Sequence, residues 1–287
     1  TTIKDIIYAP IIENKIQPLV VDVGARNGMQ EGLIPDSYAS FSKLIGFEPN
    51  EIEYKKLVEG NTDAENLGIK MSKFKDNEYF NCALWNKDEL RTLYLTNGPG
   101  AVTLMGDSER HITEKMYLNG DVKNNYYERH VKVLDQTKIS CKRLDSLLDN
   151  SQVIDILKID VEGAELKVME GCEGFFNNKN ILLIKNEFLI TPYFKEKNLL
   201  GHQQIFLDDR GYRLIDFDFN QKRYIRSTNL VNSLSDRRPI YAGDAYFILD
   251  PDVNELDPIC RHRIGLACFI KKFYSLGLDL MREANLV

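Results

Sequence analysis

The sequence lacks the features that mark several common classes of protein. It has 37 Lys and Arg against 43 Asp and Glu, so no general positive field exists to hold a nucleic-acid backbone. The longest uncharged apolar run near the carboxyl end, residues 264–270, stops at Lys271 and is too short to span a membrane. The first residues lack the basic start and apolar centre of a signal peptide. We therefore expect no nucleic-acid partner, no transmembrane segment and a cytoplasmic location.

Cysteine is scarce and is not arranged for metal binding or cross-linking. The five cysteines form no C-x-x-C pair and no zinc-like cluster, which favours free thiols in a reducing compartment. The glycine fingerprint of dinucleotide-binding proteins is also absent. Starting from Gly24, its later glycine positions hold Arg26 and Met29. This pattern argues against NAD and FAD as cofactors.

What is present is an ordinary globular composition with alternating strand and helix signals. The 287 residues are 43% hydrophobic and 28% charged, enough for a sizeable core. The alternation predicts one α/β domain with a mostly parallel sheet over residues 1–250, followed by a linker and helical extension over residues 251–287. Strands are predicted at residues 18–24, 44–48, 78–84, 91–95, 131–134, 137–141, 153–157, 180–188, 212–217 and 244–249. Helices are predicted near residues 38–44, 51–59, 144–148, 166–176 and 202–210 and from residue 261 onward.

The stretch that organises the chain is Leu157–Glu165, Leu-Lys-Ile-Asp-Val-Glu-Gly-Ala-Glu. A buried strand ends here in acidic residues, turns at Gly163 and opens a helix. In open α/β sheets, ligands bind in the crevice at the carboxyl ends of the strands. Asp160 and Glu162 stand at such an end, and Lys158 lies on the same face as Asp160. Charged groups in a central strand are costly unless they are paired, so we expect a ligand or a charged partner nearby.

A glycine-containing turn follows the first predicted strand, at residues 22–28. Glycine lets the backbone approach a ligand closely, and the start of the next helix offers free N–H groups. Glu48 ends the second strand about 20 residues later, where a carboxylate can accept two hydrogen bonds from ribose hydroxyls. Together these features indicate a nucleoside site. The alternatives are glycines that serve only packing and a Glu48 that is only solvated.

Four segments carry a family resemblance: Val21–Gly28, Phe47–Asn50, Asn81–Leu84 and Leu157–Glu165. Their sequences, order and separations resemble those of the FkbM-type S-adenosylmethionine-dependent methyltransferases, over residues 17–250. The resemblance implies a class I methyltransferase fold, a Rossmann-like, seven-stranded, mostly parallel sheet with helices on both faces. It also implies transfer of the sulfonium methyl group, usually to a hydroxyl oxygen.

The resemblance also assigns residues to the cofactor, S-adenosylmethionine. The glycine turn would face its methionine part, Glu48 its ribose, and residues 82–83 its adenine. Arg26 and Asn27 depart from the small residues often found in this turn. The implied cofactor-binding set is Asp22, Gly24, Ala25, Arg26, Gly28, Glu48, Pro49, Cys82, Ala83 and Asp160.

Methyl transfer needs a positioned acceptor and removal of its proton. Asp160 is predicted to orient or deprotonate the acceptor, and Glu187, at the end of the adjacent strand, is the second carboxylate. His202 is a third candidate, because histidine titrates near neutral pH. The alternatives are a structural ion-pair network for the carboxylates and a helix-capping role for His202. No metal site is predicted, although Asp160, Asn186 and Glu187 could offer oxygen ligands to Mg²⁺.

These features predict an O-methyltransferase acting on a hydroxyl of a sugar, glycan or other small polar metabolite. Two alternatives stay open, an N- or carboxyl-methyltransferase and a non-catalytic module that binds a nucleoside or a partner protein. The basic, apolar C-terminal helix is expected to dock on the domain or to pair in a homodimer. A contact with an anionic membrane surface is the third role considered for it.

Overall fold

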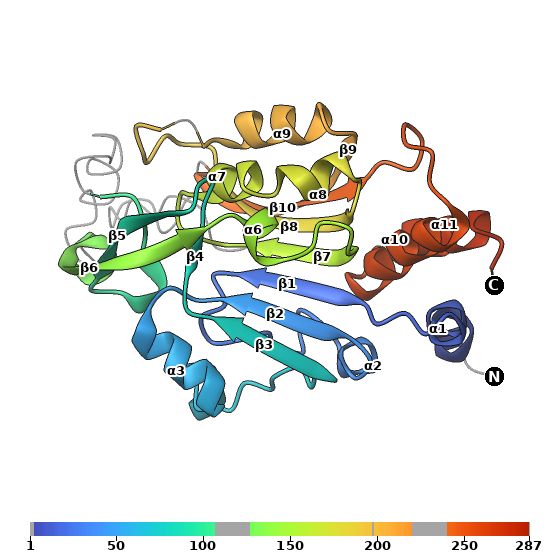
Figure 1. Cartoon of the computed structure of the whole chain (residues 1–287), viewed down its shortest axis with the longest axis horizontal. Helices are drawn as coiled ribbons and strands as arrows, with labels where there is room; N and C mark the ends of the chain where they lie inside the picture. The colour runs from blue at the N-terminus through green and yellow to red at the C-terminus, as the bar shows by residue number, and fades with distance from the viewer. Residues whose placement is uncertain (1–2, 107–126, 197, 220–239, 287) are drawn as a thin grey trace, which may run out of the picture.

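A computed structural model describes residues 3–106, 127–196, 198–219 and 240–286 of the chain. Its main sheet has seven strands in the order β3-β2-β1-β7-β8-β10-β9 (Figure 1). β10 runs antiparallel to both neighbours, and the other pairs are parallel. These strands are β1 (Leu19–Val23), β2 (Lys43–Phe47), β3 (Asp76–Phe80), β7 (Ile154–Ile159), β8 (Ile181–Leu189), β9 (Tyr212–Asp218) and β10 (Ala242–Leu249). The predicted seven-stranded, mostly parallel sheet is confirmed.

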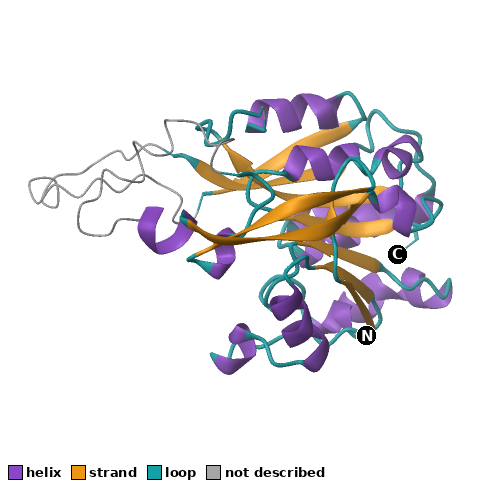
Figure 2. Cartoon of the chain, turned by 60° about the vertical axis from the view of Figure 1, so that its left-hand side comes forward, coloured by secondary structure: helices purple, strands orange, loops and turns teal. Residues whose placement is uncertain are grey.

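Helices cover both faces of this sheet, as predicted (Figure 2). α7 (Glu165–Glu170), α8 (Glu173–Asn177) and α9 (Leu200–Asp208) form one group, in which α7 and α9 pack against β8. α10 (Pro258–Ile270) packs against β7 and β8. It also contacts α11 (Tyr274–Glu283) and α1 (Ile3–Glu13). The remaining α-helices among the described residues are α2 (Asp36–Ala39), α3 (Glu51–Glu59), α4 (Asp63–Asn66) and α6 (Leu144–Leu147).

A second sheet, in the order β4-β6-β5, lies beside the carboxyl ends of the parallel strands (Figure 1). Its strands are β4 (Ala83–Leu84), β5 (Glu89–Thr96) and β6 (Val133–Lys142). The predicted antiparallel strand at residues 91–95 is confirmed within β5. The two short strands predicted at residues 131–134 and 137–141 are one strand that begins at Val133, because β6 pairs with β5 from Val133 to Cys141.

The long irregular stretch predicted at residues 97–127 is described only in part. A 3-10 turn, η1 (Pro99–Ala101), opens it, and a π-helical turn, η3 (Tyr127–Val131), closes it. Residues 107–126 lie outside the described part of the chain.

Several helix boundaries differ from prediction. The helix predicted at residues 38–44 is the short α2, because β2 already begins at Lys43. The helix predicted at residues 166–176 is two helices, and the chain turns between them at Gly171, whose N–H bonds the carbonyls of Lys167 and Val168. The C-terminal helix also divides into two, because Lys272 takes a φ of +72°, outside the helical region.

The C-terminal helices share the core of the main sheet. Arg263 of α10 makes two 2.8 Å hydrogen bonds to the buried carboxylate of Asp155 in β7. His262 lies 2.8 Å from the carbonyl of Ile7, which ties α10 to α1. The predicted docking of this extension on the domain is therefore seen. Its separation as a unit after residue 250 and its role in a homodimer stay predictions.

Two predictions from composition bear on the location of the protein. All five cysteines are free thiols, as expected. In the described ranges, none of the helices combines the length and the apolar character that a membrane crossing needs. The cytoplasmic location stays a prediction.

Candidate functional site

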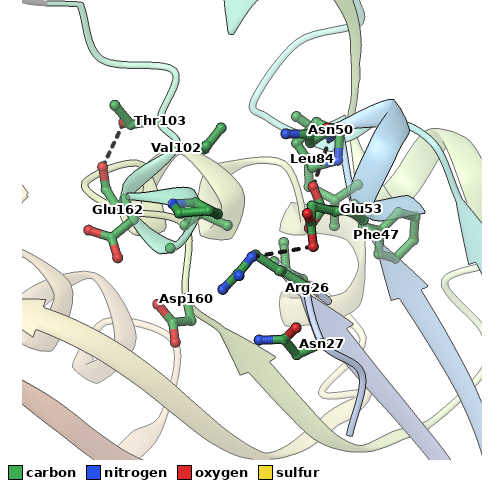
Figure 3. A pocket seen from close by; sticks show the side chains of 18 of the residues that line it. Arg26, Asn27, Phe47, Asn50, Glu53, Leu84, Val102, Thr103, Asp160 and Glu162 are labelled. Atoms are coloured by element: carbon green, nitrogen blue, oxygen red, sulfur yellow. Dashed lines mark hydrogen bonds and ion pairs between the residues drawn. The ribbon is translucent and has the colours of Figure 1, made fainter. Parts of the chain in front are cut away.

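A cavity of about 300 Å³ opens where the carboxyl ends of β1, β2 and β7 meet the second sheet (Figure 3). This volume is at the lower end of the range for small-molecule sites. Four carboxylates, those of Glu48, Glu53, Asp160 and Glu162, reach its wall. The other lining residues are Val23, Gly24, Arg26, Asn27, Gly28, Gln30, Leu33, Phe47, Pro49, Asn50, Ala83, Leu84, Leu93, Pro99, Gly100, Val102, Thr103, Leu104, Lys158 and Val161.

Gly24 brings the turn after β1 against the end of β7. Its φ is +80°, and a Cβ there would lie 2.0 Å from the carbonyl oxygen of Asp160. No other residue type fits without displacing that backbone, because no Cβ can approach an oxygen so closely. The glycine therefore serves a close contact between the turn and Asp160, as well as lining the cavity.

Behind the turn, Asp22 and Lys158 form a buried ion pair between β1 and β7. Lys158 Nζ lies 2.9 Å from Asp22 Oδ1, 3.4 Å from the carbonyl of Gly24 and 4.0 Å from Asp160 Oδ2. Burial raises the pKa of the Asp22 carboxyl, and the Lys158 ammonium partly offsets this effect. Burial also opposes the charge of Lys158, but Asp22 and Asp160 outweigh it and raise the pKa of the lysine. The lysine is thus held charged beneath the cavity.

Arg26 extends from the turn into the cavity wall, where it pairs with Glu53 (Figure 3) and with Asp63. Its Nε lies 3.4 Å from Glu53 of α3, and its Nη2 lies 3.2 Å from Asp63 of α4. Lys56 bridges the same two carboxylates at 3.0 and 3.1 Å. Because cations and anions alternate around this group, the guanidinium is fixed in place and its charge is compensated.

Asn27 brings an unsatisfied acceptor to the cavity. Its φ is +67°, a conformation that asparagine tolerates better than most residues. Its Oδ1 is buried and has no hydrogen-bond partner among the described residues. In the view of Figure 3, the Asn27 side chain lies below Arg26 and to the right of Asp160. A buried acceptor without a donor is uncommon in native proteins, and at a cavity wall it indicates where a ligand donor would bind.

Glu48 lies at the carboxyl end of β2 and is 5% exposed. Its Oε1 accepts a 2.8 Å hydrogen bond from the backbone N–H of Asn50, which fixes the carboxyl group at the wall. Burial raises the pKa of Glu48 to about 7, against the opposing effect of the Asn50 N–H. Glu48 therefore titrates in the physiological range.

Carboxylates gather at the opposite end of the cavity. Oxygens of Asp160, Glu162 and Glu187 lie within 4.8 Å of one another. Thr103 Oγ1 donates a 2.8 Å hydrogen bond to the backbone carbonyl of Glu162, which joins this acidic end to the segment after β5. Lys185 of β8 pairs with Asp244 of β10 at 2.9 Å. The proximity of the carboxylates alone does not support a metal, and no observation supports Mg²⁺ as a cofactor.

The structure brings most of the predicted site residues to one cavity. Those in its wall are Gly24, Arg26, Gly28, Glu48, Pro49, Ala83 and Asp160. Asp22, Ala25 and Cys82 are buried and do not belong to the wall, and Glu187 adjoins Asp160 from β8. His202 does not belong to it either, and its Nδ1 accepts the N–H of Leu199 at 3.2 Å, at the start of α9. This is the capping contact that was considered as the alternative for His202.

Among the polar residues of the wall, Asn27, Glu53 and Thr103 were not predicted as site residues. Asn27 has a detectable signal, because an Asn-Gly pair after a strand often adopts positive φ. Glu53 and Thr103 reach the cavity from elements whose placement depends on tertiary packing, and their sequence neighbourhoods carry no signal.

The comparisons with known proteins agree with this geometry. Residues 22–214, 193 of the 287, match the family model described as the methyltransferase FkbM domain. A curated relative, the methyltransferase sdnD of Sordaria araneosa, is 24% identical over 208 residues, which cover 68% of this chain and 73% of the relative.

A solved structure, the magnesium protoporphyrin IX methyltransferase of Synechocystis PCC 6803 with bound S-adenosylmethionine, aligns with 85% of this chain and 77% of its own. At a TM-score of 0.35 and 9% identity, that likeness is too distant to inform this chain.

A Rossmann-like sheet with a glycine turn and an acidic cavity at its carboxyl edge defines a class I methyltransferase fold. Since the family model matches most of its length, the chain belongs to the FkbM methyltransferase family. The predicted fold and the predicted enzyme class, an S-adenosylmethionine-dependent methyltransferase, are thereby confirmed.

Proposed function

We propose that this methyltransferase transfers a methyl group to a hydroxyl oxygen of a sugar, glycan or other small polar metabolite. The observation that carries the proposal is that Glu48 and Asp160 face one cavity from the ends of two strands. Glu48 suits the ribose of S-adenosylmethionine, and Asp160 would serve as the proton acceptor for the acceptor hydroxyl.

The charges of the wall suit a cationic donor. Of its six charged side chains, four are carboxylates, and both cations already have acidic partners. Lys158 is paired with Asp22, and Arg26 with Glu53. The cavity is therefore net anionic, which favours a sulfonium ion over an anionic ligand. When bound, S-adenosylmethionine would supply the activated methyl group.

The residues of the wall divide into two roles. The turn at Gly24–Gly28, which includes Asn27, would hold the amino-acid part of the cofactor. Glu48 would bind the ribose of the cofactor. Asp160 would orient the acceptor hydroxyl and take its proton. Lys158 fixes the turn and Asp160 relative to each other, because it lies near both.

The test of the proposal is calorimetric titration with S-adenosylmethionine and S-adenosylhomocysteine, followed by a panel of monosaccharides and polyols as acceptors. We expect saturable binding of both compounds and formation of S-adenosylhomocysteine with at least one hydroxyl compound. A folded protein that binds neither compound would refute the cofactor site. Methylation only of amines or carboxylates would refute the hydroxyl acceptor.

Asn27→Gly should weaken cofactor binding without straining the backbone. Glycine accepts the φ of +67° at this position, so the substitution removes only the side-chain acceptor. A hydrogen bond from a charged donor contributes about 1.5 kcal/mol or more, so the Kd of S-adenosylmethionine should rise about tenfold or more. Calorimetry measures this change. Asn27→Asp, which keeps an acceptor, is the matched control and should stay within about threefold. Equal affinity for the glycine variant and the native protein would show that Asn27 makes no such contact.

A further inference from the structure

The loop after β7 carries Asp160 and Glu162 in a backbone conformation that needs support. Glu162 has a φ of +55° and Gly163 a φ of +103°, both in regions that side chains disfavour. A Cβ at Gly163 would lie 2.1 Å from the ring of Phe194, so the loop is also tightly packed. Such a conformation persists only where surrounding contacts fix it.

Glu165 supplies these contacts from the first turn of α7. It is 1% exposed, and its Oε1 accepts hydrogen bonds from the backbone N–H groups of Val161 and Gly163, both at 3.1 Å. The carboxylate thus binds the loop on both sides of Glu162. Burial raises the pKa of Glu165, and its bonds with Asn198 and the loop oppose that rise.

The same carboxylate begins a buried chain of amides. Asn198 Nδ2 donates to Glu165 Oε2 at 2.6 Å, and Asn198 Oδ1 accepts from Gln203 Nε2 at 3.1 Å. Gln203 also donates to the backbone carbonyl of Glu187 at 3.3 Å and accepts from Asn186 Nδ2 at 2.7 Å. Asn198 is 4% exposed, and Gln203 and Asn186 are 0% exposed.

This chain joins the two strand ends that bear the acidic residues. At one end it holds the loop of Asp160 and Glu162, and at the other it holds the backbone of Glu187 in β8. Those three carboxylates lie within 4.8 Å of one another, although like charges repel. The cavity wall contains none of the three residues Glu165, Asn198 and Gln203.

We propose that Glu165, Asn198 and Gln203 form a positioning network that sets the place of Asp160 and Glu187 relative to the cofactor cavity. The inference rests on the proposed role of Asp160 in methyl transfer. The three residues act through the backbone and touch neither the cofactor nor the acceptor. A carboxylate buried only to cap α7 would not need a chain of amides that ends on the neighbouring strand.

The test exchanges the roles of one hydrogen-bonded pair. In Glu165→Gln, an amide NH₂ would face the NH₂ of Asn198, and in Asn198→Asp, two carboxylates would face each other at the 2.6 Å contact. The double variant Glu165→Gln, Asn198→Asp restores a donor and an acceptor and keeps the native net charge. Gln204→Met, on the exposed side of α9, is the control outside the network.

The first readout is amide hydrogen exchange at Val161 and Gly163, which needs no methyl transfer. Each single variant should exchange at least tenfold faster at both amides, and the double variant should return toward the native rate. The second readout is turnover with a hydroxyl compound methylated in the acceptor panel. Here kcat should fall about 10- to 100-fold in the single variants and recover in the double variant. The Kd of S-adenosylhomocysteine should stay within threefold throughout.

The outcomes separate this inference from the proposed function. Altered loop exchange in a protein that methylates no hydroxyl would uphold the network and reject the reaction. Unchanged exchange and kcat in folded Glu165→Gln, or a double variant no better than its parents, would overturn the positioning role. If Glu165→Gln does not fold, Gln203→Met probes the far end of the network. It should raise loop exchange and lower kcat about tenfold, and native values of both would overturn the proposal.

Discussion

Asp160→Asn should lose most of its turnover and keep its affinity for the cofactor. Asparagine has nearly the same shape but cannot take a proton from an acceptor hydroxyl at neutral pH. General-base catalysis contributes about 10²- to 10⁴-fold, so kcat should fall within that range. The Kd of S-adenosylhomocysteine should change less than about threefold, because the contact between Gly24 and residue 160 involves the backbone carbonyl. Single-turnover kinetics and calorimetry measure the two quantities.

Two further measurements make this result specific. Glu162→Gln removes a neighbouring carboxylate of the same acidic group and should lower kcat by less than about tenfold. Turnover of the native enzyme should not change with a chelator if Asp160 acts as a base, whereas loss of turnover that Mg²⁺ restores would assign the three carboxylates to a metal. Unchanged kcat in Asp160→Asn would move the proton acceptor elsewhere, with Glu187 as the next candidate.

The sequence could predict the acidic strand end but not its supports. The alternation of charged and apolar residues placed Lys158 and Asp160 on one face, and the structure agrees. The main partner of Lys158 is Asp22, 136 residues away, and their contact depends on the parallel register of β1 with β7. Pairing at such separation is decided by tertiary packing and leaves no local pattern.

Glu162 and Glu165 illustrate the same limit within five residues. Glu165 begins the helix that follows the strand, yet its carboxylate bonds the amides of Val161 and Gly163 in the preceding loop. The reason is the positive φ of Glu162, a backbone conformation that its residue type does not predict. The spacing of carboxylates in the motif therefore indicates an acidic strand end, but the contacts of Glu165 with the loop depend on a backbone conformation that spacing does not predict.

The fold was more predictable than the boundaries of its helices. Predicted strands overlap all seven strands of the main sheet, and buried strands such as β1 and β8 leave a strong local signal. The segment predicted as one strand at residues 78–84 is instead divided between β3 and β4, which belong to different sheets. Apolar helical spacing continues through residues 171–172 and 271–273, so it could not locate the breaks after α7 and α10. Each break depends on the backbone conformation of one or two residues, and such a local change does not alter the periodic spacing of apolar residues.

Glu48 should make cofactor affinity depend on pH near neutrality. Its pKa is about 7 in the free protein, because burial disfavours the carboxylate. Ribose hydroxyls donate best to the ionised form, so binding should release the proton. Affinity for S-adenosylhomocysteine should therefore rise about tenfold between pH 6 and pH 8. Glu48→Gln should bind more weakly with a flat profile, and calorimetry across this range checks both.

The same carboxyl should destabilise the free protein at alkaline pH. The pKa of Glu48 rises from 4.5 to about 7 on folding, so the folded state binds the proton more tightly than the unfolded state. The resulting stability is fully present below pH 4.5 and is lost as the pH rises through 7. The loss is at most about 3 kcal/mol, since each pH unit corresponds to about 1.4 kcal/mol.

Glu48→Gln should therefore be more stable than the native protein at pH 8, by up to about 3 kcal/mol, with the difference shrinking toward pH 5. Urea unfolding at both pH values measures it. Glu59→Gln, on the exposed end of α3, is the control and should change stability by less than about 0.5 kcal/mol at either pH. A Glu48→Gln protein less stable than the native one at pH 8 would mean that this carboxylate is held by contacts that outweigh its burial. Greater stability with weaker binding would identify Glu48 as a residue kept for the cofactor at the expense of the fold.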